Sequence, residues 1–394
     1  MNEYAVKINE KGVIAVDDTI LVKDAECKAG SKILTGYKAL FSAEAVERLE
    51  KKGYAVSGKT TVGEFGLDLV GEFAYGNEAE GALKGAAAEL VAGGEVKAAL
   101  AVDMNGTPRR AAALSGVAFL KPTYGTVSRY GVISCAASGE QVGVYAKGAD
   151  GIAEIMSVIA GHDGKDGTSL PEASYEYKTD LPLKGKKVAI VKELLDKADE
   201  ASKAKVTAFA ESLKKNGVVV EEISLPLADA ANTAWQILMC AETCNNVSRY
   251  DGVKYGYRAE TYKNIDELYV NSRTEGFNFL TKAVILYGSD VLSKNRYKDC
   301  YDKSLRVRRV VADAVKALCE QYDALLTPAC GKTAFDSYDI HEAFGRVFEQ
   351  SAFTAIANLI GIPALSANGV QLMGKAFGES TLLSLSKSAE GKGE

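Results

Sequence analysis

Lys187-Val-Ala-Ile-Val191 and Val218-Val-Val-Glu-Glu-Ile-Ser-Leu225 are two apolar runs, rich in β-branched residues, that each predict a β-strand. Between them, Val206, Phe209 and Leu213 recur at helical spacing, and a glycine follows the last turn of the pattern. A strand, a helix and a second strand in this order favour two parallel strands joined by a crossover helix. The segment therefore predicts an α/β fold.

The same alternation continues on both sides of this segment. The patterns predict helices over 43–52, 86–92, 306–322 and 352–359, and strands over 54–57, 96–102 and 324–328. We therefore expect a β-sheet that is covered by helices on both faces. Residues 388–394, which read Ser-Ala-Glu-Gly-Lys-Gly-Glu, are expected to form a disordered tail.

The composition is that of an ordinary globular protein, and it excludes several classes. Of the 394 residues, 47% are hydrophobic and 25% are charged, which excludes a disordered chain. The net charge is −5, so no general basic field favours direct DNA binding or an anionic membrane. No apolar run reaches the length of a membrane span, and the N-terminus carries no secretory signal. A cytoplasmic location is expected.

Neither a metal nor a cofactor is predicted. The seven cysteines form no CxxC pair, and we interpret them as buried or half-buried thiols in a reducing compartment. Cys240 and Cys244 are four residues apart on an expected helix. The only histidines, His162 and His341, leave little material for a zinc site or a Ser-His-Asp triad, and His162 is expected in a solvated loop. The stretch from Gly81 to Gly94 contains neither GxGxxG nor a P-loop motif.

The stretch Ala112-Ala-Leu-Ser-Gly-Val-Ala-Phe-Leu-Lys-Pro-Thr-Tyr-Gly-Thr-Val-Ser-Arg-Tyr-Gly131 carries a resemblance to a known family. Further matching segments follow in order at 160–163, 166–169, 248–260, 274–277, 323–328, 358–366 and 371–375. Together they resemble the amidase signature family, most closely the A subunits of glutamyl-tRNA(Gln) and aspartyl-tRNA(Asn) amidotransferases. The resemblance covers residues 12–390, and the family's N-terminal helical segment has no counterpart.

The resemblance implies a fold, a chemistry and a set of partners. The implied fold is a single domain over 1–394 with a central mixed β-sheet covered by α-helices on both faces. Family members hydrolyse amides with a Ser-cisSer-Lys triad, in which an uncharged lysine is the base, one serine relays the proton and a second serine attacks. The implied partners are amidotransferase B-like or C-like subunits, with tRNA reached only through such a complex.

Two of the three triad positions carry unsuitable side chains. Matching Ile14-Ala-Val-Asp-Asp-Thr-Ile20 to the family's lysine segment places Asp17 at the lysine position. Lys23 could replace it only if six residues were deleted. Leu83 stands at the position of the bridging serine, and no serine or threonine occurs between Val62 and Gly106. Because leucine can neither donate nor accept a proton, the relay is lost.

The nucleophile position keeps a hydroxyl. The family's Asp-Thr-Gly-Gly-Ser-Ile-Arg motif is matched by Asp103-Met-Asn-Gly-Thr-Pro-Arg109, so Thr107 replaces the serine. Met104, Asn105 and Gly106 then form the turn whose N–H groups would hold an oxyanion. Asn105 replaces a glycine where positive φ or close backbone approach is expected, and Pro108 would crowd the turn and remove a donor. Alternatively, Thr107 merely ends a strand.

The substrate-binding positions are altered as well. Ala283 and Val284 stand where the family carries a pair of arginines, one of which can hold the carboxylate of glutamine. We therefore expect a catalytically impaired amidase-fold protein that acts by binding. One alternative is an active subunit or amidase that uses Thr107 with Asp17 or Lys23 as a non-standard base. The other is a decayed relative without a selected activity.

Overall fold

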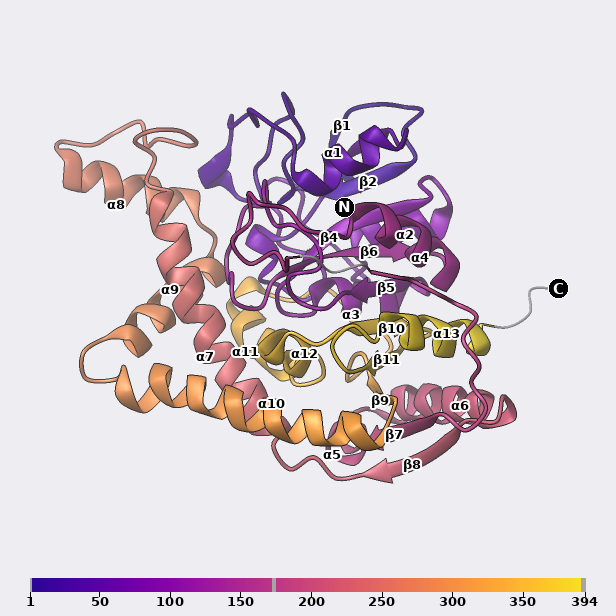
Figure 1. The fold of residues 1–394 in the computed structure, drawn as a ribbon. Coiled ribbons are helices and arrows are strands. Elements are labelled where there is room, and N and C mark those ends of the chain that lie inside the picture. The colour runs from indigo at the N-terminus through magenta and orange to yellow at the C-terminus, as the bar shows by residue number, and fades with distance from the viewer. Residues whose placement is uncertain (1, 172–174, 391–394) are drawn as a thin grey trace.

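The core of the computed structural model, which describes residues 2–171 and 175–390, is one sheet of eleven strands (Figure 1). In space the strands follow the order β1-β3-β2-β4-β6-β5-β10-β11-β9-β7-β8. The strands are β1 (Tyr4–Lys7), β2 (Ile14–Asp17), β3 (Val56–Thr60), β4 (Ala98–Asp103), β5 (Ala118–Lys121), β6 (Gln141–Ala146), β7 (Lys187–Val191), β8 (Val219–Ile223), β9 (Ala324–Pro328), β10 (Ala364–Ala367) and β11 (Val370–Met373).

The sheet is mixed, as the resemblance implies. Strand β2 runs parallel to β3 and β4, and β7 runs parallel to β8 and β9, whereas the remaining pairs are antiparallel. The parallel pairing of β7 with β8, from Lys187 opposite Val219 to Val191 opposite Ile223, confirms the predicted crossover unit. Its helix, α6 (Glu200–Lys215), packs on the sheet between β8 and β11.

A hairpin near the C-terminus joins two parts of the sheet. On one side β10 pairs with β5, with Ser366 opposite Phe119. On the other side β11 pairs with β9, with Val370 opposite Pro328. Within the sheet, residues 364–373 therefore join the strands of the first 146 residues to β7, β8 and β9.

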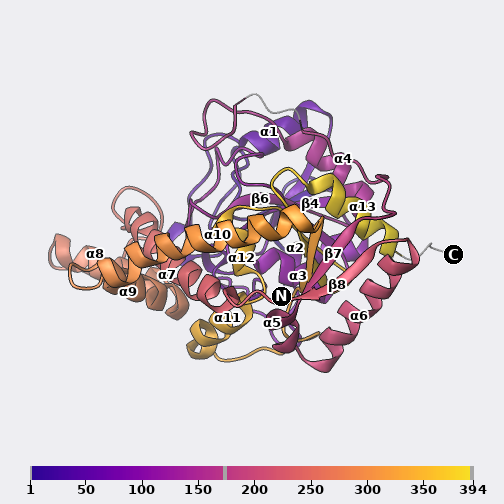
Figure 2. The same ribbon diagram turned by 60° about the horizontal axis from the view of Figure 1, so that its bottom comes forward.

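Helices cover both faces of the sheet (Figure 2). Alternate residues of one strand show the two faces: Leu100 belongs to the apolar cluster that includes residues of α1, α4, α6 and α13, whereas Ala99 and Ala101 belong to the cluster that includes residues of α2 and α3. The remaining helices are α1 (Glu44–Lys51), α2 (Ala86–Gly93), α3 (Thr107–Ser115), α4 (Ala149–Ile159), α5 (Lys192–Asp196), α7 (Ala228–Asn246), α8 (Ile265–Gly276), α9 (Phe279–Leu292), α10 (Lys303–Gln321), α11 (Ala343–Ser351), α12 (Ala355–Ile360) and α13 (Glu379–Ala389). None of the helices within the described residues is long and apolar enough to cross a membrane.

Several predicted boundaries are wrong. The strand expected over 96–102 begins at Ala98, and the helices expected over 306–322 and 352–359 begin at Lys303 and Ala355. The strand expected over 54–57 begins two residues later, because Tyr54 still closes the end of α1 by donating its N–H to the carbonyl of Leu49. The tail expected to be disordered from residue 388 is helical at Ser388 and Ala389, which belong to α13. Residues 391–394 lie outside the described part of the chain.

Candidate active site

Two of the three triad positions lie at the same edge of the sheet. Asp17 is the last residue of β2 and Asp103 the last residue of the neighbouring parallel strand β4. The chain turns through residues 104–106 after β4, and α3 begins at Thr107. A carboxylate oxygen of Asp17 accepts the N–H of Val102, 2.7 Å away, so the strand end that carries the turn is bonded directly to Asp17.

The carboxylate of Asp17 forms hydrogen bonds within the turn that follows β2. Its carboxylate is buried and also accepts the N–H and the hydroxyl of Thr19. Burial raises the pKa of Asp17 above its usual value, although the hydrogen bonds from Thr19 and Val102 oppose the change. Its oxygens hydrogen-bond only to Thr19 and Val102 in the described part of the chain, so Asp17 does not contact the hydroxyl of Thr107.

Neither of two nearby lysines replaces the missing base. The side chain of Lys23 is exposed in the loop after β2. Lys59 of β3, which the sequence pattern did not predict as a site residue, is buried with its Nζ 2.9 Å from Oδ1 of Asp18. Burial alone would lower the pKa of Lys59, but the Asp18 carboxylate outweighs it and raises that pKa. Lys59 therefore stays charged and cannot accept a proton.

Leu83 lies in the apolar core. Its side chain is buried with residues of α2 and α3, and its N–H donates to the carbonyl of Phe335 at 2.7 Å. The segment that would carry the proton relay is therefore held by a backbone hydrogen bond and apolar packing, with no hydroxyl on the side chain.

Thr107 begins a helix and does not end a strand, so the alternative interpretation of this residue is wrong. Its hydroxyl donates to the carbonyl oxygens of Asp68 at 2.8 Å and Gly66 at 3.2 Å, and it accepts from Nη2 of Arg110 at 3.3 Å. The side chain is 6% exposed. The hydroxyl thus faces backbone acceptors and a cation, neither of which can remove its proton.

The loop at 66–73, whose acidic side chains bond to its own backbone, covers this hydroxyl. The Glu72 carboxylate accepts the N–H groups of Leu69, Val70 and Gly71, and Asp68 accepts those of Gly71 and Phe73. Burial and the neighbouring Glu72 raise the pKa of Asp68 well above its usual value. The loop is therefore held in place both by its own carboxylates and by the hydroxyl of Thr107, which is occupied in this role.

The turn before Thr107 corrects two expectations. Gly106, which matches a glycine of the motif, has φ of 80°, and a Cβ there would lie 2.3 Å from Thr354. Asn105 does not have positive φ, so the left-handed position is Gly106 and the asparagine fits without backbone strain. Pro108 is the second residue of α3, where a helix leaves the N–H without a partner, so the proline fits the turn. Met104 is buried beside the turn.

Asn105 is bonded to other helices through its side chain and its carbonyl. Its Oδ1 accepts from Nε2 of Gln236 at 3.1 Å, and its backbone oxygen accepts from Arg110 at 2.7 Å and from Thr354 at 3.1 Å. These bonds link the turn to α7 and to the residue before α12.

A buried ion pair supports the turn from behind. Arg109 donates to Asp103 with Nε at 2.7 Å and Nη2 at 3.1 Å, and also donates to Asn358 and Gln371. All four side chains are fully buried. Burial alone would raise the pKa of Asp103, but the Arg109 guanidinium holds that pKa below its usual value. This network was not predicted from the sequence, although Asp103 and Arg109 match the motif.

Three other residues, Ala283, Val284 and Lys121, bear on the chemistry of the site. Ala283 is half-buried and Val284 is buried on α9, which packs along α7. Because both side chains are apolar, neither supplies a charge for a carboxylate. Lys121, at the end of β5, is fully buried, and burial lowers its pKa to about 7. Its Nζ donates to the carbonyl of Pro122 at 2.9 Å and bonds to no hydroxyl in the described part of the chain.

Five cavities in the described part of the chain are not lined by the triad positions, Asp17, Leu83 and Thr107. Two of them nevertheless include residues next to Asp17 and Leu83. These cavities therefore give a substrate no preformed access to the three residues.

The sequence is similar to known amidases and amidotransferase subunits. The family model described as Amidase matches residues 12–383. The A subunit of the glutamyl-tRNA(Gln) amidotransferase of Halothermothrix orenii is 36% identical, over 94% of this chain and 82% of that protein. The corresponding protein of Streptococcus mutans is 33% identical, over 96% of this chain and 84% of that protein.

Solved structures agree in fold. The A subunit of the glutamyl-tRNA(Gln) amidotransferase of Thermotoga maritima has a TM-score of 0.82 at 26% identity, covering 99% of this chain and 87% of that one. The native peptide amidase of Stenotrophomonas maltophilia has a TM-score of 0.76 at 23% identity, covering 96% of this chain and 81% of that one.

Proposed function

Because this chain belongs to the amidase signature family, we propose that it is an amidotransferase A-subunit-like protein that is catalytically impaired and acts by binding. The single observation that carries the proposal is the state of the Thr107 hydroxyl, which donates to two backbone carbonyls under a closed loop. A nucleophile needs a base within hydrogen-bond reach, and no such group contacts Thr107 in the described part of the chain.

The other two positions support the same conclusion. Asp17 accepts bonds from its own turn, and Leu83 is part of the core. A general base contributes about 10²- to 10⁴-fold to the rate, and members of a triad act as a unit, so the losses are not additive. The expected rate of amide hydrolysis is close to background.

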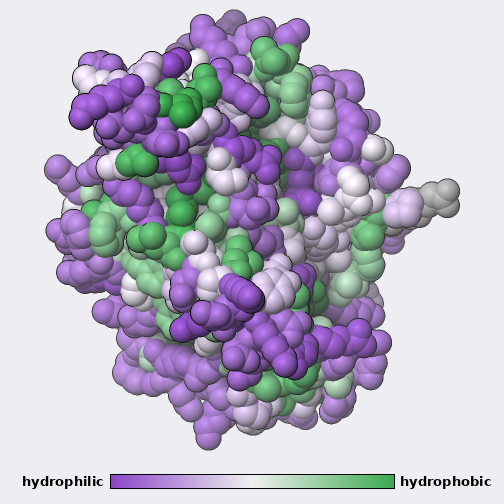
Figure 3. Space-filling view, turned by 90° about the vertical axis from the view of Figure 1, so that its left-hand side faces the viewer, coloured by the Kyte–Doolittle hydropathy of each residue, from purple (hydrophilic) through white to green (hydrophobic). Residues whose placement is uncertain are grey.

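The proposed partner resembles the B or C subunit of an amidotransferase, and tRNA would be reached only through that complex, in the cytoplasm. An exposed apolar groove of about 360 Å³ on α8 and α9 supports a binding role. Val270 is 61% exposed and Leu286 is 72% exposed along it. Figure 3 looks onto this side of the molecule, where hydrophobic side chains lie among hydrophilic ones. Exposed apolar patches of this kind are typical of protein interfaces.

The second candidate is an active amidase or A subunit that uses Thr107 as the nucleophile with a non-standard base. It is favoured by the retained hydroxyl at the start of α3, directly after Gly106. Opening of the loop at 66–73 would be required before any base could reach Thr107.

The test measures ammonia release from glutamine and from simple amides, with Thr107→Ala as the control. We expect the wild-type protein and Thr107→Ala to give equal, near-background rates. Turnover that disappears in Thr107→Ala would establish the second candidate.

Binding is tested with purified B and C subunits. We expect one of them to bind the wild-type chain and the complex to be lost in a Val270→Glu, Leu286→Glu double variant. Leu40→Glu is the matched control, because Leu40 is 78% exposed and does not line the groove. Equal binding by all three proteins would exclude this groove as the interface.

A further inference from the structure

A small cavity lies between the loop at 64–78 and the segment that joins α8 to α9. Its volume is about 110 Å³, which is enough for a ligand of a few non-hydrogen atoms. Three of the residues that line it are glutamates, Glu64, Glu78 and Glu275, and one is a lysine, Lys32. The cavity shares Phe277 with the groove on α8 and α9, but the proposed function assigns it no ligand.

Glu64 is a buried carboxylate that forms no ion pair with the described residues. Its side chain is 3% exposed, and its oxygens accept the hydroxyl of Ser31 and the N–H of Asn278. No lysine, arginine or histidine nitrogen in the described part of the chain forms an ion pair with it. A buried carboxylate is costly unless a cation offsets its charge, so a cation bound in the cavity would stabilise ionised Glu64.

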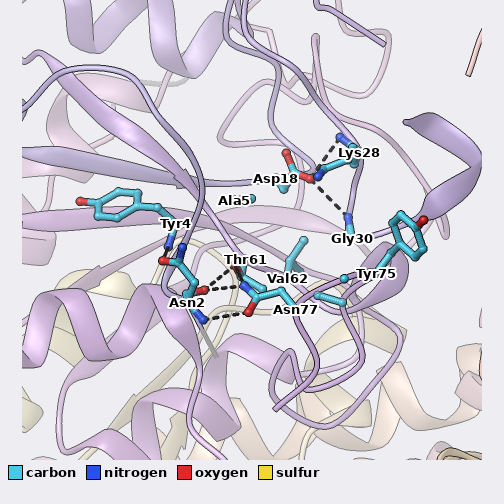
Figure 4. A pocket seen from close by; sticks show the side chains of 12 residues that line it. Asn2, Tyr4, Ala5, Asp18, Lys28, Gly30, Thr61, Val62, Tyr75 and Asn77 are labelled. Carbon is cyan, nitrogen blue, oxygen red and sulfur yellow. Dashed lines mark hydrogen bonds between the residues drawn. The ribbon is translucent and has the colours of Figure 1, made fainter. Parts of the chain in front are cut away.

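The adjoining cavity shows how such a charge is satisfied inside the protein. That cavity, of about 230 Å³, shares Gly30 and Tyr75 with the first (Figure 4). Its buried carboxylate is Asp18, which accepts the N–H groups of Lys28 and Gly30 and pairs with Lys59 at 2.9 Å. Asp18 therefore has an internal cation, whereas Glu64 has none among the described residues.

The rest of the lining fits an organic cation. Phe73, Tyr75 and Phe277 line the cavity with Glu64, so their rings offer apolar surface to the alkyl part of an organic cation. The one lysine of the lining, Lys32, places its Nζ 4.0 Å from the ring centre of Tyr257, which does not line the cavity. No group of three or more metal-ligating side chains occurs within the described residues, so the arrangement does not suit a divalent metal.

We propose that this cavity binds a small primary alkylammonium ion, with the ammonium group on the Glu64 carboxylate and the alkyl part against the aromatic rings.

The ionisation of Glu64 provides a second readout. Burial raises the pKa of Glu64 to about 7, although the bonds from Ser31 and Asn278 and the positive charge of Lys282 oppose the change. The charged or titratable groups that face it are Lys32, Glu78 and Glu275 in the lining, Lys282 of α9 and the Cys135 thiol. Because Glu64 attracts a cation only when it is ionised, the affinity for the alkylammonium ion is expected to rise as the pH increases from about 6 to about 8.

The experiment titrates the full chain with ethylammonium chloride at constant ionic strength, following the amide NMR signal of Asn278 and ligand saturation transfer. A ligand of three non-hydrogen atoms binds with a dissociation constant of about 1 mM at best. Ethanol is the neutral ligand control. Glu64→Gln is the test variant, and Glu95→Gln, which removes an exposed glutamate away from the cavity, is the matched control.

We expect ethylammonium to shift the Asn278 signal in the wild type and in Glu95→Gln, with at least about tenfold weaker binding in Glu64→Gln. We also expect the pH dependence to disappear in Glu64→Gln. Absence of binding to the folded wild type, equal binding by Glu64→Gln, or equal binding of ethanol would each overturn the proposal. Far-ultraviolet circular dichroism establishes that each variant is folded.

Discussion

Asp17 and Asp103 are buried carboxylates at the ends of neighbouring parallel strands, but their partners leave their pKa values shifted in opposite directions. Asp103 is bonded by the Arg109 guanidinium, and its pKa is lowered. Asp17 is bonded only by Val102 and Thr19 among the described residues, and its pKa is raised. The residues behind the turn form a paired charged network, whereas Asp17 in front of it has neither a paired cation nor a contact with Thr107. Asp103 therefore supports the turn, whereas Asp17, at the position of the family's base, is not placed to remove a proton from Thr107.

The largest loss of stability is expected when the ion pair of Arg109 and Asp103 is broken. Arg109→Met leaves Asp103 buried without its cation, so the free energy of unfolding should fall by about 3–5 kcal/mol. Urea denaturation followed by circular dichroism measures the change. If Arg109→Met fails to fold, Asp103→Asn, which leaves the arginine unpaired, should still show a clear loss. A change below about 1 kcal/mol in both variants would contradict the structural role of the pair.

The second-largest loss of stability is expected at Leu83, which stands at the position of the family's relay serine. Leu83→Ser removes a buried apolar side chain and leaves a hydroxyl in the core, so the free energy of unfolding should fall by about 3 kcal/mol. Although the variant restores a serine at the relay position, the described residues supply no base for it, and ammonia release should stay at the background rate. Activity in Leu83→Ser would show that the front of the turn retains a working base.

A smaller effect is expected at Thr107. Thr107→Val removes the donor to the carbonyls of Gly66 and Asp68, which should cost about 1–2 kcal/mol of unfolding free energy, measured by urea denaturation. Thr107→Ser keeps the hydroxyl and is the matched control, with a change expected below about 1 kcal/mol. Equal losses in the two variants would mean that the hydroxyl bonds contribute little.

The smallest effect is expected at Asp17, and its sign depends on pH. The raised pKa means that ionising Asp17 costs the folded state, so the wild type loses stability relative to Asp17→Asn as the pH rises from about 4 towards neutrality. For Asp103 the lowered pKa predicts the opposite, a contribution that is present above about pH 4 and lost below it. At about pH 7, Asp17→Asn should differ from the wild type by less than about 1 kcal/mol. Unfolding curves at about pH 3, 4, 5.5 and 7 test both signs.

The fold was predictable where its signals are local. The apolar repeat at Val206, Phe209 and Leu213 predicted α6, and the glycine that follows it, Gly217, has φ of 80°. Such signals depend on residues within one or two turns of each other. They survive in any context that buries the same face of the helix.

At the site, the sequence predicted which residues occupy the family's positions but not which partners they contact. Arg109 bonds to Gln371, 262 positions away, and the carbonyls that accept the Thr107 hydroxyl belong to a loop about 40 positions earlier. No spacing rule connects residues at such separations. The expectation at Asn105 was wrong because the glycine rule applies to the residue that adopts positive φ, which is Gly106. Glu64 was missed because a single glutamate gives no sign of its burial.

The hairpin of β10 and β11 sets the order in which the chain can fold during synthesis. Strand β5 has no second neighbour until residues 364–367 emerge, and β9 has none on that side until residues 370–373 follow. Most of the 394 residues are therefore made before the two parts of the sheet can join. In a nascent or truncated chain, the open edges of β5 and β9 are sites for pairing with other chains, so this protein should need chaperone protection late in translation.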